Sequence, residues 1–117
     1  MTRILFFSYP KCSTCRKASK WLDQNNIDYE FFDIVKMPPR KEFLELALKQ
    51  FSSDKKKLFN TRGKSFKLID YDIQTLNDKK IIELLLKDGK LIKRPFLILN
   101  EMQVILGFNE DRYKEHF

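Results

Sequence analysis

The feature that most constrains this chain is a Cys-Ser-Thr-Cys motif, with its thiols at Cys12 and Cys15, between a strand pattern and a helical pattern. The apolar run of residues 4–7 predicts a buried strand, and the apolar side chains of residues 15–22 recur at helical spacing. Cys12 should therefore lie at or next to a helix N-terminus, where unpaired backbone N–H groups and the helix dipole favour an anion. Because the thiolate is the reactive form of cysteine, we predict that Cys12 is a nucleophile. Cys15 is placed to attack a mixed disulfide on Cys12, so the pair is interpreted as a redox dithiol.

Other roles for the two thiols fit the sequence less well. They are the only cysteines, and His116 is the only histidine, so the four ligands usual for structural zinc are lacking and we predict no metal site. A structural disulfide would close a very short loop and constrain the unfolded chain little. Two inert thiols in a core-packed helix are the remaining alternative.

Length and composition indicate one globular domain over residues 1–117, with 43% hydrophobic residues and eleven phenylalanines. The N-terminus has only four consecutive strongly apolar residues, so we expect neither a signal peptide nor a membrane span, and hence a cytosolic protein. In the cytosol a cysteine pair is more often catalytic or sensing than structural.

The net charge of +7 is unevenly distributed. Residues 36–67 contain ten Lys or Arg and three acids, whereas the rest of the chain is balanced. A basic face of this kind suits an acidic protein, a nucleic acid or an anionic substrate, and a solvated helical face is the alternative. We expect no direct nucleic-acid binding, because there is no aromatic–basic RNA motif, zinc finger or basic zipper.

The predicted elements alternate between strand and helix. A strand over residues 3–8, a helix over 13–25 and a strand over 29–34 form a βαβ unit with parallel strands. A helical segment over about residues 36–90 follows. Within it, Asn77 is expected to cap a helix that Gly89 closes.

The C-terminal part predicts a hairpin followed by a helix. Residues 96–99 and 103–106 are expected to pair antiparallel across a two-residue turn at Asn100-Glu101, and Asn109 is expected to cap the last helix. The order βαβ – helices – ββα, with a Cys-x-x-Cys motif, predicts an α/β, thioredoxin-like fold with an inserted helical segment.

Four segments carry a family resemblance, and they span nearly the whole chain: residues 9–17, 60–62, 92–95 and 107–111. On these segments the chain resembles the family of glutaredoxin-coupled arsenate reductases (ArsC) and Spx regulators. It is most similar to the branch of short, arsenate reductase-like proteins of the Spx/MgsR type.

The resemblance implies a set of site residues around the first thiol. Pro95 is expected to have a cis peptide bond and to lie beside Cys12, although a trans proline opening an edge strand is the alternative. Arg94 is expected to direct its guanidinium at the sulfur, where it would stabilise a thiolate or bind an oxyanion, unless it is a surface arginine. Arg62 is a second candidate anion ligand by family position, and a basic loop is the alternative.

Basic residues that flank the motif extend this site. Lys11, Arg16 and Lys17 add positive potential, which should lower the pKa of Cys12. Lys11 and Arg16 are therefore candidate ligands for an anion or an anionic substrate.

The predicted function is thiol–disulfide exchange. Cys12 attacks an oxidised protein or small molecule, and Cys15 resolves the adduct. An external reductant (thioredoxin, glutaredoxin or a low-molecular-weight thiol) then restores the dithiol without a bound cofactor. We expect a monomer.

Two alternatives follow from the resemblance. One is an Spx-like redox sensor that binds the RNA polymerase α-subunit, although residues 51–54 lack the glycine that Spx uses there. The other is an arsenate reductase. Against it, Gly107 occupies the position of the third arginine of those enzymes, which typically also lack a cysteine at the position of Cys15.

Overall fold

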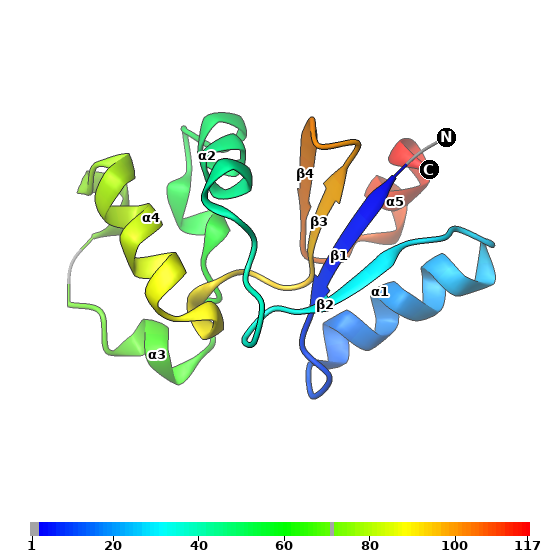
Figure 1. Cartoon of the computed structure of the whole chain (residues 1–117). Helices are drawn as coiled ribbons and strands as arrows, with labels where there is room; N and C mark the ends of the chain where they lie inside the picture. The colour runs from blue at the N-terminus through cyan, green and yellow to red at the C-terminus, as the bar shows by residue number, and fades with distance from the viewer. Residues whose placement is uncertain (1–2, 71) are drawn as a thin grey trace.

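A computed structural model describes residues 3–70 and 72–117. A four-stranded sheet lies between two sets of helices (Figure 1). The elements in chain order are β1 (Ile4–Ser8), α1 (Ser13–Gln24), β2 (Glu30–Asp33), α2 (Lys41–Gln50), η1 (Lys55–Leu58), α3 (Lys64–Lys67), η2 (Ile73–Thr75), α4 (Asp78–Lys87), η3 (Gly89–Leu91), β3 (Phe96–Leu99), β4 (Gln103–Leu106) and α5 (Glu110–His116).

The sheet has the strand order β2-β1-β3-β4. β1 pairs with β2 in parallel and with β3 antiparallel, and β4 pairs antiparallel with β3. This confirms the predicted βαβ unit and hairpin, and with the cysteine helix after β1 the fold is thioredoxin-like. The helical segment lies between β2 and β3, as expected.

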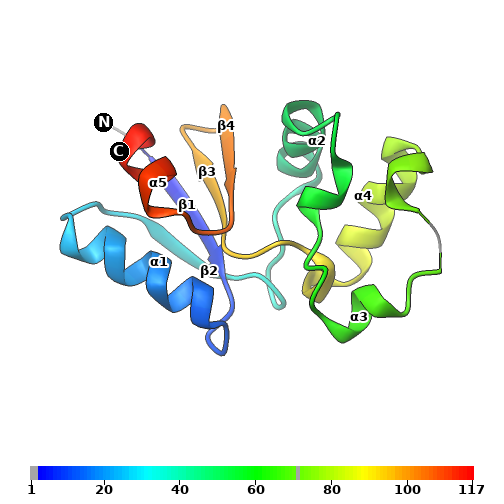
Figure 2. The ribbon, with the colours of Figure 1, turned by 180° about the vertical axis from the view of Figure 1, so that it is seen from behind.

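The two faces of the sheet carry separate cores because side chains alternate along each strand. Ile4 and Phe6 of β1 face α1 and α5, where they pack with Leu22. Leu5 and Phe7 face the helices between β2 and β3 and belong to the larger core. Figure 2 shows α1 and α5 on one side of the sheet and α2, α3 and α4 on the other.

The hairpin between β3 and β4 turns at Asn100 and Glu101, as predicted. Both residues have positive φ, 53° and 59°, which matches the twist of the flanking strands. The Met102 N–H donates to the Leu99 carbonyl at 3.0 Å. The pairing starts at Leu99 and Gln103, so the connection is one residue longer than predicted.

The predictions for Asn77 and Gly89, at the two ends of one helix in the helical segment, have different outcomes. Asn77 caps α4, as predicted, because its side chain accepts from the Lys80 N–H at 2.8 Å. Gly89 does not close α4 as a left-handed cap, because α4 ends at Lys87 and Gly89 begins η3. Gly89 is required for close approach instead.

The close approach at Gly89 joins the helical segment to the end of β2. A Cβ atom at Gly89 would collide with the Ile34 carbonyl oxygen and would lie 3.1 Å from the Val35 Cα atom. Only a residue without a side chain fits this space.

No helix in residues 3–70 and 72–117 combines the length and the apolar character that a membrane crossing requires.

Candidate active site

Cys12 is the N-cap residue of α1, which confirms its predicted place at a helix N-terminus. Its own N–H donates to the Tyr9 carbonyl at 2.9 Å, and this bond fixes the turn that leads out of β1. Its sulfur accepts from the Cys15 N–H at 3.3 Å. The Cys12 sulfur therefore occupies the position of a capping oxygen, where backbone N–H groups stabilise negative charge.

The surroundings of Cys12 favour its thiolate. Burial raises the pKa of this half-buried thiol, but hydrogen bonds from the Cys15 thiol and backbone N–H, and from the Arg94 guanidinium, outweigh that effect. The positive charge of Arg94 acts in the same direction. The net pKa of Cys12 lies below that of an ordinary cysteine, as predicted for a nucleophile.

Cys15 has the opposite character. Its exposed fraction is 1%, and its pKa is raised to about 11, with burial as the largest cause. The hydrogen bond to Cys12 and the negative charge that Cys12 carries contribute to this rise, whereas hydrogen bonds with the Tyr9 backbone and the Ser8 side chain oppose it. The two thiols are thus a half-buried, acidic one and a buried, weakly acidic one, which are the usual properties of an attacking and a resolving cysteine.

Arg94 is held in place by an aromatic ring. Its guanidinium carbon lies 4.7 Å from the centre of the Tyr9 ring, a cation–π contact that orients the group toward Cys12. The Arg94–Pro95 peptide bond is cis, as the resemblance implied. Sequence analysis gave Tyr9 no role, and its only signal was its place at the end of the strand before the motif.

The structure brings together Cys12, Cys15 and Arg94, but not every predicted basic residue. Lys11 and Arg16 are exposed, and neither is among the groups that lower the pKa of Cys12. Arg62 is exposed in the connection between η1 and α3. The acidity of Cys12 therefore arises from Cys15 and Arg94, and the anion-binding roles of the other three residues stay predictions.

Tyr113 of α5 is a buried residue to which sequence analysis gave no role. Its hydroxyl donates to the Gly107 carbonyl at 2.7 Å, and it is fully buried. Burial, followed by the charge of Cys15, raises the pKa of Tyr113 above its usual range. The centres of the Tyr113 and Trp21 rings lie 5.6 Å apart, so α5 packs against α1.

Within residues 3–70 and 72–117, no group of three or more His, Cys, Asp or Glu side chains gathers in a way that could hold a metal ion. The chemistry that the arrangement itself offers is a thiolate at a helix N-terminus with a guanidinium beside it and a second thiol in the first helical turn.

Comparisons with known proteins give a consistent result. The family model described as ArsC family matches residues 7–116. The protein YusI of Bacillus subtilis, named as uncharacterised, is 37% identical over 97% of this chain and 98% of its own length. The global transcriptional regulator Spx of Streptococcus pyogenes is 30% identical over 95% of this chain and 82% of its own length. A crystal structure described as a possible arsenate reductase from Streptococcus mutans is 35% identical and superposes with a TM-score of 0.87, covering 97% of this chain and 98% of that one.

Proposed function

Because the chain belongs to the ArsC family, we propose that it is a thiol–disulfide redox protein with Cys12 as the nucleophile and Cys15 as the resolving thiol. The observation that carries this proposal is the difference between the two thiols, since the pKa of Cys12 is lowered and that of Cys15 is raised. Two inert thiols packed into a core would both be buried and weakly acidic.

The proposed reaction begins at Cys12. Its thiolate attacks one sulfur of a substrate disulfide, a Cys12–substrate disulfide forms, and the substrate's other sulfur leaves as a thiolate that takes up a proton. Arg94 stabilises the attacking thiolate and remains beside the sulfur during the exchange.

The second step uses Cys15. While Cys12 carries the substrate it has no negative charge, so one of the causes that raise the pKa of Cys15 is removed. Cys15 loses its proton, attacks the Cys12 sulfur and releases the reduced substrate. The Cys12–Cys15 disulfide that forms has taken up the oxidation, and an external thiol reductant returns two electrons and two protons to it.

The test is to react three proteins with hydroxyethyl disulfide and to measure their masses. We expect the wild-type chain to form its internal disulfide, Cys15→Ser to retain a hydroxyethylthiol adduct, and Cys12→Ser to form neither product. An adduct that persists on the wild-type chain would show that Cys15 does not resolve. Equal reaction of Cys12→Ser would show that Cys12 is not the nucleophile.

A second candidate function rests on the Spx relative, which is named as a transcriptional regulator. In that case the dithiol acts as a sensor, and the chain binds the RNA polymerase α-subunit in only one redox state. Binding of the purified α-subunit to the reduced and the oxidised chain distinguishes the two proposals, because an oxidoreductase binds no polymerase in either state.

Arsenate reduction is a third candidate, favoured by the description of the Streptococcus mutans structure. Arg94 and Arg62 would then bind the oxyanion. Arsenate turnover that is lost in Arg94→Met and Arg62→Met supports this function, and an absence of turnover in the wild-type chain with thioredoxin and glutaredoxin as reductants excludes it.

A further inference from the structure

The free edge of β4 contains backbone groups that face away from the sheet. The Gly107 N–H donates to the Pro95 carbonyl at 2.9 Å, so Gly107 faces β3. Because residues alternate along an antiparallel ladder, Leu106 and Val104 direct their N–H and C=O groups outward. β4 is the last strand in the sheet order, so no further strand covers these groups.

A side-chain amide occupies part of this edge. The Val104 N–H donates to the Gln50 Oε1 atom at 2.7 Å, and the Gln50 Nε2 atom donates to the Val104 carbonyl at 3.2 Å. The carboxamide of Gln50 thus makes the same pair of hydrogen bonds that a peptide group of a neighbouring strand would make. The edge is therefore in a geometry that accepts backbone partners.

The backbone hydrogen bonds of Leu106, the next residue whose N–H and C=O groups face outward, are incomplete. The Leu106 carbonyl accepts from Arg112 at 3.5 Å, which is at the limit of a hydrogen bond. No residue that the structure describes accepts from the Leu106 N–H. Leu106 is 7% exposed and lines the cleft beside β4, and its N–H is directed away from β3.

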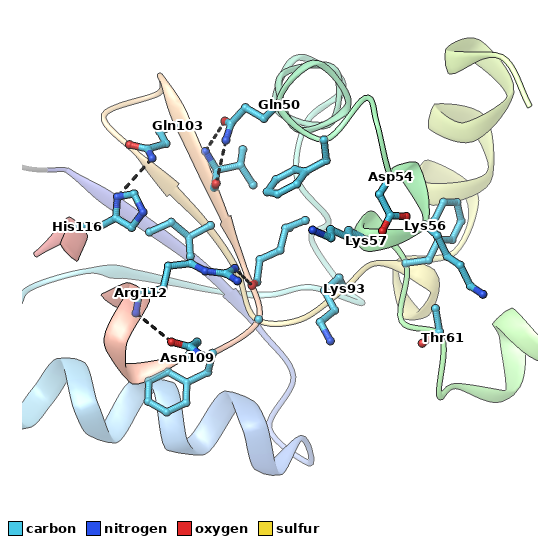
Figure 3. A pocket seen from close by; sticks show the side chains of 17 residues that line it. Gln50, Asp54, Lys56, Lys57, Thr61, Lys93, Gln103, Asn109, Arg112 and His116 are labelled. Atoms are coloured by element: carbon cyan, nitrogen blue, oxygen red, sulfur yellow. Dashed lines mark hydrogen bonds between the residues drawn. The ribbon is translucent and has the colours of Figure 1, made fainter. Parts of the chain in front are cut away.

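The cleft beside β4 has a volume of about 720 Å³ and is basic. Lys57 of η1, Lys93 before β3 and Arg112 of α5 surround the same space from three separate elements (Figure 3). Lys56 adds a fourth cation and Asp54 is the acid in the lining. In the described part of the chain none of the four cations is in an ion pair.

Apolar side chains form the rest of the lining. Val104 and Leu106 belong to the strand itself, and Phe51 and Phe108 lie at the sides. The cleft therefore combines an outward-facing backbone donor at Leu106, apolar contact and positive charge outside ion pairs, which together suit an extended polypeptide with acidic side chains.

We propose that the β4 cleft binds an acidic, extended segment of a partner protein, which adds a fifth strand to the sheet. The segment accepts from the Leu106 N–H, extends past the Gln50 carboxamide, and places alternate acidic side chains against Lys57, Lys93 and Arg112. This site is separate from the thiol chemistry, because Cys12, Cys15 and Arg94 are not among the residues that line the cleft.

The experiment uses the full chain with three fluorescein-labelled peptides. The first contains four Glu-Val repeats, the second has the same sequence with every second backbone nitrogen methylated, and the third contains four Lys-Val repeats. We expect saturable binding of the first peptide and no binding of the third. The second should bind at least about tenfold more weakly, because its methyl groups prevent the close approach of the two backbones that brings a peptide carbonyl to the Leu106 N–H. In ¹⁵N spectra the Leu106 amide signal should shift with the first peptide.

Two charge-reversed variants test the location. Lys57→Glu with Lys93→Glu should weaken binding of the acidic peptide by about tenfold or more, and added salt should weaken wild-type binding. Lys20→Glu with Lys80→Glu makes the same change of net charge at exposed positions away from the cleft, and it should bind as the wild type does.

Three results would each overturn the proposal. The first is that the acidic peptide shows no saturable binding. The second is that the methylated peptide binds as tightly as the unmethylated one, which would mean that charge alone attracts it. The third is that both double variants lose the same amount of affinity for the acidic peptide. Cys12→Ser should bind the acidic peptide as tightly as the wild type, so peptide binding and thiol exchange succeed or fail independently.

Discussion

Gly89→Ala should destabilise the protein through a collision between the helical segment and the end of β2. The added methyl group meets the Ile34 carbonyl oxygen, and the Val35 Cα atom lies 3.1 Å away. Both are backbone atoms that cannot rotate aside. Forcing such overlap costs about 1–3 kcal/mol, and a collision with backbone belongs at the upper end of that range. The smaller entropy of an unfolded chain with alanine offsets about 0.4–1 kcal/mol.

The expected net loss is about 2 kcal/mol in the free energy of unfolding. With an m-value of about 1.5 kcal/mol/M, the midpoint of urea unfolding should fall by roughly 1.3 M. Gly63→Ala is the matched control, because its methyl group would meet the flexible Asn60 side chain at 2.8 Å and its φ of −77° suits any residue. Gly63→Ala should stay within about 0.5 kcal/mol of the wild type.

The reasoning is refuted if the urea midpoint of Gly89→Ala stays within about 0.3 M of the wild-type midpoint at an unchanged m-value. Such a result would mean that the contact between η3 and the end of β2 relaxes without strain.

Further predictions concern the two thiols and Tyr113 of α5. The rate of alkylation of Cys12 by iodoacetamide should level off below the pH usual for cysteine, and Arg94→Met should move this plateau to higher pH, because the arginine lowers the pKa of Cys12. Arg16→Met, at an exposed position, should leave the plateau unchanged, and an equal effect of both variants would contradict the assignment. Cys15 should stay unmodified at neutral pH until the chain is unfolded in guanidinium chloride, because it is buried and its pKa is raised to about 11. Tyr113→Phe should lower the free energy of unfolding by about 1–2 kcal/mol, since it leaves a buried carbonyl without its donor. Urea unfolding measures this loss, and an unchanged midpoint would show that the hydrogen bond is not needed.

Local patterns in the sequence were sufficient to predict most elements of the fold. The apolar run before Cys12 and the helical spacing after Cys15 place β1 and α1, and Asn77 marks the start of α4 through its side-chain cap. Each of these signals acts within a few residues of the chain, so it can be recognised without knowledge of the tertiary structure.

The contacts that complete the site could not be predicted in this way. Tyr9 orients Arg94, and the charge of Cys15 acts on Tyr113, across long separations in the sequence. The error at Gly89 has the same origin. A glycine after a helix is typical of a left-handed cap, whereas here the requirement comes from the approach of a distant strand.

The division of the molecule by its sheet has an evolutionary consequence. Cys12 caps a helix that packs on one face of the sheet, whereas the helices inserted between β2 and β3 pack on the other. Residues on the outer surfaces of α2 and α4 can therefore be substituted without disturbing the N-cap of α1. Selection on the outer surfaces of α2 and α4 and selection on the cap of α1 therefore act on opposite faces, so one scaffold can diverge on one face while the other is inherited unchanged.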